Sequence, residues 1–124
     1  MRILLIEDDE SVAQIVTTGM KDANHEVTHT ADGQDGFEQA MDKRFDVMIF
    51  DRQLPGGVDG AELLRKLRDK RVETPVLFLS GLGALGDWMI GLEAGGDDYI
   101  VKPFVFSDLL TRVEALHQRR ETTG

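Results

Sequence analysis

The sequence predicts an α/β fold in which one parallel sheet carries helices on both of its faces. Five short apolar runs each precede a segment of helical period, and three of the runs are almost continuously apolar. Continuous apolar runs are typical of strands that are buried on both faces. The alternation occupies 124 residues, a length suited to one compact domain, and right-handed crossovers would place all five strands in one sheet.

The strands are predicted from runs rich in Ile, Leu, Val, Met and Phe, with turn residues at their ends. They span residues 2–6, 26–30, 46–50, 75–79 and 98–101. The first, third and fourth runs (RILLI, DVMIF and PVLFL) are the most apolar, so these strands are expected to be covered on both faces.

The helices are predicted from apolar residues three and four positions apart. They span residues 10–22, 33–42 and 60–70, the region from Leu85 through Met89 to Leu92, and the region from Leu109 to Leu116. Ser107 is the expected N-cap of the last helix.

The composition favours a cytoplasmic domain. Apolar residues make up 41% of the chain, charged residues 30%, and no apolar stretch or leader suggests a membrane span or secretion. There is no cysteine, which excludes disulfides and thiolate metal sites. The formal net charge of -9 argues against nucleic acid as a direct partner and favours a hard cation.

Polar side chains follow four of the five predicted strands. They are Glu7, Asp8 and Asp9 after the first strand, Asp51 after the third, Ser80 after the fourth and Lys102 after the fifth. Each alone is more often a helix cap, a turn residue or a surface charge. Because parallel strands end at one edge of the sheet, all four groups are expected to converge there, and the convergence favours a site.

The converging groups suit phosphoryl chemistry. Carboxylates held close together repel each other, so an ionised cluster needs a cation. Oxygen ligands favour Mg²⁺, or Mn²⁺ in its place, and Mg²⁺ keeps positions that a phosphoryl oxygen can take. A carboxylate such as Asp51 can itself accept a phosphoryl group when a metal and a lysine neutralise the transferred charge.

Four stretches resemble the receiver domain of bacterial response regulators, the phosphoacceptor half of two-component signalling. They are ILLIEDDE (3–10), DVMIFDRQLPGGVDG (46–60), TPVLFLSG (74–81) and GLEAGGDDYIVKPF (91–104). The resemblance covers essentially the whole chain. It implies a doubly wound, flavodoxin-like (βα)5 fold with strand order 2-1-3-4-5, which agrees with the alternation of elements.

The resemblance also assigns a phosphoacceptor and a metal site. It implies that Asp51 accepts phosphate from a partner histidine kinase. Mg²⁺ would be held by Asp51 and Asp8 directly, by Glu7 through water and by the backbone carbonyl of Gln53.

Further residues match the family's switch. Ser80 falls where a hydroxyl bonds the phosphoryl group, and Lys102 falls where a lysine pairs with the phosphoryl oxygens. The bond from Lys102 to Pro103 is expected to be cis. Tyr99 matches the switch aromatic, whose ring moves inward as Ser80 follows the phosphoryl group. The output would be a shift of the face formed by the fourth helix, the fifth strand and the fifth helix.

The stretch from Gly91 onwards is most similar to regulators whose receivers are joined to a C-terminal winged-helix DNA-binding domain. In that class the same face dimerises on phosphorylation, and the candidate charges are Glu93, Asp97, Asp98 and Arg112. The expected receiver spans residues 1–120, and residues 121–124 would begin a linker to an effector domain absent from this chain. DNA would be bound only through that domain. A stand-alone receiver acting through protein contacts is the alternative.

Three positions depart from the family pattern. Gly56-Gly57-Val58 carries one extra residue, which is expected to alter the loop without moving Asp51. Arg52 replaces an apolar residue and is expected to reach towards the acidic edge or into solvent. Trp88 stands where a basic residue is common, and would either pack at the edge of the core or anchor a partner.

The sequence argues against two other functions. An aspartyl-phosphate phosphatase of the haloacid dehalogenase type needs a second aspartate two residues beyond the nucleophile, and position 53 is Gln. A flavodoxin-like flavin carrier needs phosphate donors after the first strand, where this chain has an acidic triplet. The sequence therefore predicts a switch and not an enzyme, with only self-phosphorylation from small donors and slow autodephosphorylation as chemistry.

Overall fold

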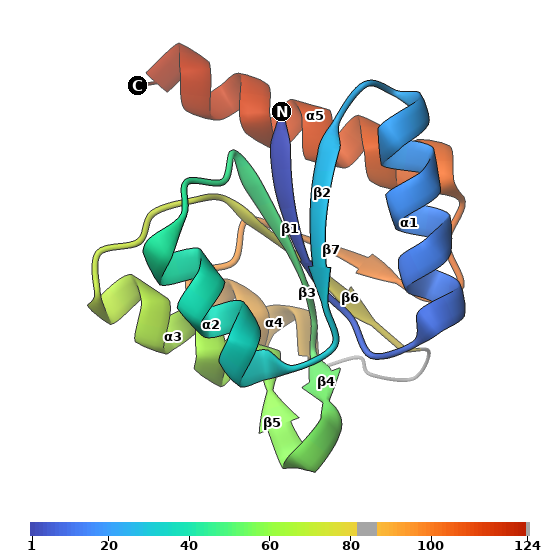
Figure 1. The fold of residues 1–124 in the computed structure, drawn as a ribbon. Coiled ribbons are helices and arrows are strands. Elements are labelled where there is room, and N and C mark those ends of the chain that lie inside the picture. The colour runs from blue at the N-terminus through green and yellow to red at the C-terminus, as the bar shows by residue number, and fades with distance from the viewer. Residues whose placement is uncertain (82–86, 124) are drawn as a thin grey trace.

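The computed structural model describes residues 1–81 and 87–123, and for residues 87–89 and 121–123 it describes the backbone alone. The elements are β1 (Arg2–Ile6), α1 (Glu10–Asp22), β2 (Glu26–Thr30), α2 (Gly33–Asp42), β3 (Val47–Asp51), β4 (Gln53–Leu54), the 3-10 turn η1 (Pro55–Gly57), β5 (Val58–Asp59), α3 (Gly60–Asp69), β6 (Val76–Ser80), α4 (Asp87–Glu93), β7 (Asp98–Val101) and α5 (Phe106–Thr123). Five strands form one parallel sheet in the order β2-β1-β3-β6-β7 (Figure 1). β6 and β7 are the fourth and fifth strands of this sheet along the chain, because β4 and β5 form a separate pair. The predicted doubly wound fold and its strand order 2-1-3-4-5 are thereby confirmed.

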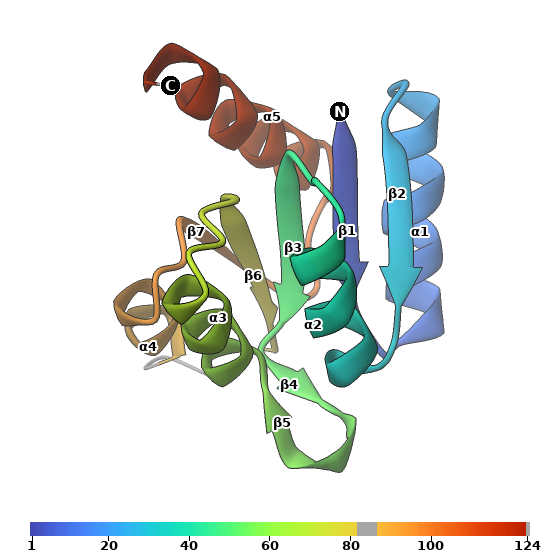
Figure 2. The ribbon, with the colours of Figure 1, turned by 60° about the vertical axis from the view of Figure 1, so that its left-hand side comes forward.

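Helices cover both faces of the sheet, with α1 and α5 on one face and α2, α3 and α4 on the other (Figures 1 and 2). Alternate residues of each central strand enter different cores. In β1, Ile3 and Leu5 join the cluster with α1 and α5, while Leu4 and Ile6 join the cluster with α2 and α3. This explains why β1 reads as a continuous apolar run, since neither of its faces meets solvent.

The strands β3 and β6 each end one residue later than predicted. Asp51 is the last residue of β3 and pairs in register with Leu79, and Ser80 is the last residue of β6 and pairs with Val101. The Arg52 amide continues the ladder by donating to the Leu79 carbonyl at 2.9 Å. The sheet itself therefore fixes the backbone of both polar residues.

Aspartates begin three of the helices. Asp9, Asp32 and Asp59 are the N-caps of α1, α2 and α3, and each side chain accepts a hydrogen bond from an amide two residues along. The expected Ser107 cap is wrong, because α5 already begins at Phe106. Val105 takes the cap position there through its carbonyl, to which the third and fourth residues after it donate.

Helix α5 continues to Thr123, three residues beyond the limit of 120 expected for the domain. The limit itself stays a prediction. Leu85, expected in the fourth helix, lies outside the described residues, as do the side chains of Trp88 and Met89. Within residues 1–81 and 87–123, no helix is both long and apolar enough to cross a membrane.

The segment with the extra residue forms a short hairpin. β4 and β5 pair antiparallel, and the hairpin projects from the edge of the sheet at which the main strands end (Figures 1 and 2). Gly56 and Gly57 both have φ of 75°, a backbone conformation that residues other than glycine rarely adopt. The two glycines therefore make the tight turn possible.

Arg52 lies at the base of this hairpin, and its burial contradicts the expectation that it reaches into solvent. Its side chain is buried, and its Nε and Nη2 donate to the two carboxylate oxygens of Asp59 at 3.1 and 3.3 Å. The guanidinium also lies over the ring of Phe78, 5.9 Å from its centroid. The reason is topological, since the hairpin returns Asp59 to the position beside Arg52. Asp59 also caps α3 by accepting from the Ala61 amide at 2.9 Å.

Replacing Asp59 tests how much its two contacts, with Arg52 and with the Ala61 amide, contribute to stability. Asp59→Ala removes both the α3 cap and the carboxylate partner of a buried arginine, so we expect the free energy of unfolding to fall by about 3 kcal/mol. Urea denaturation measures the change. Asp32→Ala, which removes the α2 cap alone, serves as the control and should cost about 1 kcal/mol. Equal losses in the two variants would contradict a stabilising role for the ion pair.

Candidate functional site

Three of the predicted carboxylates meet at the carboxyl edge of the sheet. Glu7 and Asp8 follow β1, and Asp51 ends β3, the neighbouring strand. One carboxylate oxygen from each lies within 4.8 Å of the other two. Glu7 is fully buried and Asp51 is 6% exposed, whereas Asp8 faces solvent. The parallel register creates this cluster, since Ile6 and Phe50, the residues just before Glu7 and Asp51, are paired.

Lys102 joins the cluster from the end of β7, the outermost strand on one side of the sheet. Its ammonium donates to Oε1 of Glu7 at 2.5 Å and to Oδ2 of Asp51 at 3.3 Å. Burial lowers the pKa of Lys102, but the two carboxylates outweigh burial and leave the pKa above its usual range. The lysine is therefore a fixed positive charge at neutral pH. The peptide bond to Pro103 is cis, as predicted.

Glu7 is the perturbed acid of the cluster. Burial, followed by the nearby Asp51 carboxylate, raises the pKa of Glu7 to about 8, although Lys102 pulls it down. Its second oxygen, Oε2, is buried and has no hydrogen-bond partner among the described residues. A buried carboxylate oxygen without a partner is costly, and a hard cation would satisfy it. The residues present thus fit a Mg²⁺ ion.

Backbone groups and a buried hydroxyl complete the surroundings of Asp51. The Gln53 amide donates to Oδ1 of Asp51 at 3.2 Å, while the Gln53 side chain is exposed. Ser80 is 3% exposed and ends β6, the strand next to β3. A Cβ at Gly60 would lie 2.2 Å from the Asp51 carbonyl oxygen, so only glycine allows α3 to begin this close to Asp51.

Two other residues singled out in the sequence have contacts away from the carboxylate cluster. Asp9 caps α1 by accepting from the amides of Ser11 and Val12, which confirms the simpler interpretation of this residue. Tyr99 lies in β7, half-buried against the core formed with α2, α3 and α4. It precedes by two residues Val101, the register partner of Ser80. Its role as a switch residue stays a prediction.

One contact of this site was not predicted from the sequence. Nε2 of His29 lies 2.8 Å from the carbonyl oxygen of Glu7, to which it can donate. His29 is in β2, the edge strand that pairs with β1, and its register partner is Leu5. The signal was available, because the second strand of this topology must end beside the first.

The charged residues proposed for the output face are largely paired within the chain. Arg112 contacts Asp98 at 3.0 Å and Asp108 at 3.1 Å. Asp97 accepts from the Val76 amide at 2.9 Å, and the Arg68 guanidinium lies 3.4 Å away. Glu93 is exposed on α4. These positions therefore have structural contacts before any partner binds.

Comparison with known proteins agrees with this geometry. The chain matches the family described as response regulator receiver domain over residues 3–114. It is 40% identical over 122 residues to the probable transcriptional regulatory protein SilR of Salmonella typhimurium, covering 98% of this chain and 53% of that protein. The chain thus spans about half the length of the curated relatives it matches.

Solved structures extend the likeness to the fold. The receiver domain of Francisella response regulator 1452 aligns with a TM-score of 0.89 at 33% identity, over 96% of this chain and 98% of that one. The receiver domain of the sensor histidine kinase PA1611 from Pseudomonas aeruginosa PAO1 aligns with a TM-score of 0.85 at 28% identity, over 94% and 97%. That structure holds a magnesium ion in its active site cleft. On its sequence and its structure alike, this chain belongs to the family of response regulator receiver domains.

Proposed function

We propose that this chain is the phosphorylation-dependent switch of a two-component transcriptional regulator and that Asp51 accepts the phosphoryl group. The observation that carries the proposal is the convergence of Glu7, Asp8 and Asp51 with the Lys102 ammonium at one edge of the sheet. Response regulators are signalling proteins and usually not enzymes. Self-phosphorylation and slow autodephosphorylation are accordingly the only chemistry proposed.

In the proposed transfer, an Asp51 carboxylate oxygen attacks phosphorus. The bond from phosphorus to the donor atom breaks as the new oxygen–phosphorus bond forms, and the donor leaves with the electron pair and takes up a proton from water. Lys102, 3.3 Å from Asp51, would pair with a phosphoryl oxygen. The Ser80 hydroxyl would donate to another oxygen and so report that the group is present.

The metal would be Mg²⁺, held by Asp8 and Asp51, by Glu7 through water and by the Gln53 carbonyl, and Mn²⁺ could replace it. When bound, the ion would offset the negative charge of the carboxylates and of the incoming phosphoryl group. The unpartnered, buried oxygen of Glu7 supports this assignment.

An apolar surface beside the site suits the proposed kinase partner. Ile15 on α1 is 54% exposed, and Val105, three residues after Lys102, is 69% exposed. Ile15 and Phe106, the residue after Val105, line a groove of about 530 Å³ along α1. Exposed apolar side chains grouped beside a reactive group are typical of contact surfaces. A sensor histidine kinase delivering phosphate to Asp51 would cover this surface.

The output would pass through the face formed by α4, β7 and α5, on which Tyr99 and Arg112 lie. Phosphorylation would shift this face and promote a homodimer. The likeness to transcriptional regulators of about twice the length supports a C-terminal DNA-binding domain in the longer protein, which would act in the cytoplasm.

The first test is intact mass after incubation with acetyl phosphate and Mg²⁺. We expect one phosphate adduct that requires Mg²⁺ and is absent in Asp51→Asn, because Asp51 ends β3 at the phosphoacceptor position of the receiver family and lies beside the Lys102 ammonium. Asp9→Asn, which alters an exposed cap, should keep the adduct. An adduct that persists in Asp51→Asn would sink the assignment of the acceptor.

The second test concerns pH, because Glu7 holds a proton that Mg²⁺ must displace. The pKa of Glu7 is about 8 in the folded chain, against an ordinary value of 4.5. Between pH 4.5 and 8 the folded chain therefore binds a proton that the unfolded chain does not. The free energy of unfolding of the metal-free chain accordingly falls as the pH rises through this range. Mg²⁺ affinity should rise with pH by up to about tenfold per unit from pH 6 to 8 and level off above.

Isothermal titration calorimetry across this range measures the slope. Glu7→Gln should abolish the pH dependence, whereas Glu10→Gln, a matched change on the exposed start of α1, should keep it. A parent chain whose Mg²⁺ affinity does not vary between pH 6 and 8 contradicts the proposed role of Glu7.

The third test uses beryllofluoride, which mimics the phosphoryl group, and light scattering to follow mass. We expect a dimer that forms only with beryllofluoride and is weakened several-fold by Arg112→Ala, because this change breaks two ion pairs on the output face. Arg65→Ala, which breaks a comparable pair with Glu62 on α3, should leave the dimer intact. A chain that remains monomeric at high concentration refutes the proposed dimer.

A further inference from the structure

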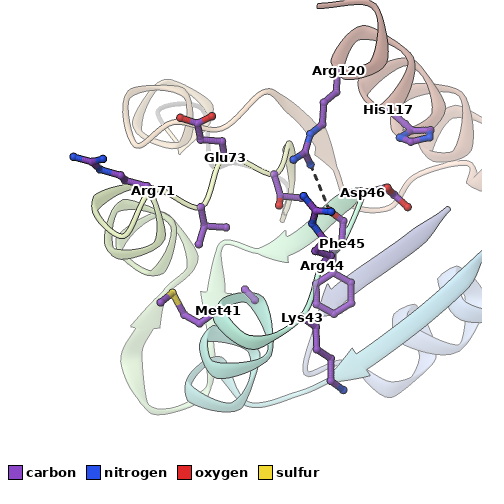
Figure 3. Close-up of a pocket in the computed structure, with 12 residues that line it drawn as sticks. Met41, Lys43, Arg44, Phe45, Asp46, Arg71, Glu73, His117 and Arg120 are labelled. Carbon is purple, nitrogen blue, oxygen red and sulfur yellow. Dashed lines mark hydrogen bonds between the residues drawn. The ribbon is translucent and has the colours of Figure 1, made fainter. Parts of the chain in front are cut away.

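A second polar pocket lies at the opposite edge of the sheet, where the strands begin. It has a volume of about 560 Å³ and is lined by residues of three separate segments: the end of α2 with the loop into β3, the loop from α3 into β6, and the last turns of α5 (Figure 3). Strands of five residues separate this edge from Asp51 by roughly 16 Å. The pocket is therefore distinct from the carboxylate cluster.

The lining of this pocket is basic although the chain is acidic. Four cations line it, against two carboxylates and one histidine, in a chain of formal net charge -9. The cations are Lys43, Arg44, Arg71 and Arg120, the carboxylates are Asp46 and Glu73, and the histidine is His117. One carboxylate is already engaged, since Asp46 accepts from the Arg2 amide at 2.6 Å. Positive charge thus dominates the pocket.

Two of the arginines have no carboxylate partner in the described part of the chain. Neither Arg44 nor Arg71 forms an ion pair there, and both are exposed. Arg120 reaches from α5 to the loop that carries Arg44 and donates to the Phe45 carbonyl at 3.4 Å (Figure 3). Two segments that carry arginines and lie far apart in sequence are thus brought together. A guanidinium group can bind phosphate through two parallel N–H···O bonds.

The backbone at Arg71 is a second, independent observation. Arg71 has φ of 64° and follows the C-cap Lys70 of α3, a position that favours glycine. The equivalent position after α1 is Asn24, a residue suited to this conformation. Both helices end with the same pair of amide–carbonyl bonds, so the geometry of the turn does not require arginine. An arginine kept in an unfavourable conformation at a pocket rim points to a ligand.

The wall that carries Arg71 is also held rigid. Arg68 donates to the carbonyls of Val72 and Thr74, both at 2.8 Å, and to that of Gly95 at 2.8 Å. These bonds fix the backbone of the wall before any ligand binds.

We propose that this pocket binds a small ligand bearing phosphate groups, with Arg44, Arg71 and Arg120 as the recognising cations. The apolar side chains of Met41 and Val72 in the same lining would accommodate the non-phosphate part of such a ligand. The ligand would bind independently of phosphorylation at Asp51, because the two sites occupy opposite edges.

The test is an NMR titration of the whole chain with pyrophosphate in EDTA, which keeps divalent metal out of the carboxylate cluster. We expect saturable shifts of the amides of residues 43–46 and 71–74. Arg44→Gln and Arg71→Gly should each weaken binding about tenfold, as expected for the loss of one charged hydrogen-bonding partner. Lys21→Gln, an equal loss of charge on α1, should leave the affinity unchanged.

Arg71→Gly separates a ligand-binding role from a structural one. Because glycine suits this backbone, the variant should melt no lower than the parent while it loses pyrophosphate affinity. The proposal is overturned if the shifts are not saturable, if Arg71→Gly binds as tightly as the parent, or if hexaglutamate at equal ionic strength binds the same residues more tightly than pyrophosphate.

Discussion

The site at the carboxyl edge of the sheet depends on the Lys102 ammonium. It contacts Glu7 and Asp51, which follow or end strands two and three positions away from β7 in the sheet. Two unit charges 4 Å apart interact by about 4 kcal/mol at the effective dielectric constant found near a protein surface. Without the lysine, the pKa of Glu7 would rise further in the metal-free chain, because Lys102 is the group that lowers it. The position of β7 therefore determines the electrostatic environment of Glu7 and Asp51, which follow or end strands that do not pair with β7.

Clusters of predominantly opposite charge lie at the two ends of the parallel strands. The carboxyl ends gather acidic residues, and the amino ends are flanked by the arginines of the pocket in Figure 3. Such a separation produces a field along the strands that a net charge of -9 does not reveal. Ligands of opposite sign can therefore be attracted to opposite ends of one small domain.

Much of the fold and part of the site could be predicted because their determinants are local. Continuous apolar runs, helical spacing and a residue at the end of each strand place Glu7, Asp8 and Asp51 together once the strands are parallel. The partner of Arg52 could not be predicted in this way, because its contact with Asp59 exists only after the hairpin has turned. The basic pocket was missed for the same reason, since its residues share no motif and meet only through the packing of α5.

The ion pair of Arg52 and Asp59 has a consequence for how this segment can vary. Both residues lie at the base of the hairpin, where they join the end of β3 to the first turn of α3. The tip, Pro55–Gly57, is exposed, and a side chain added at either of its glycines would meet no other atom within 4 Å. Because the contact between Arg52 and Asp59 fixes the base of the hairpin, we expect a change of length at the tip to leave the position of Asp51 unchanged. This makes the tip the natural place at which to insert a label or a tag without disturbing the acceptor.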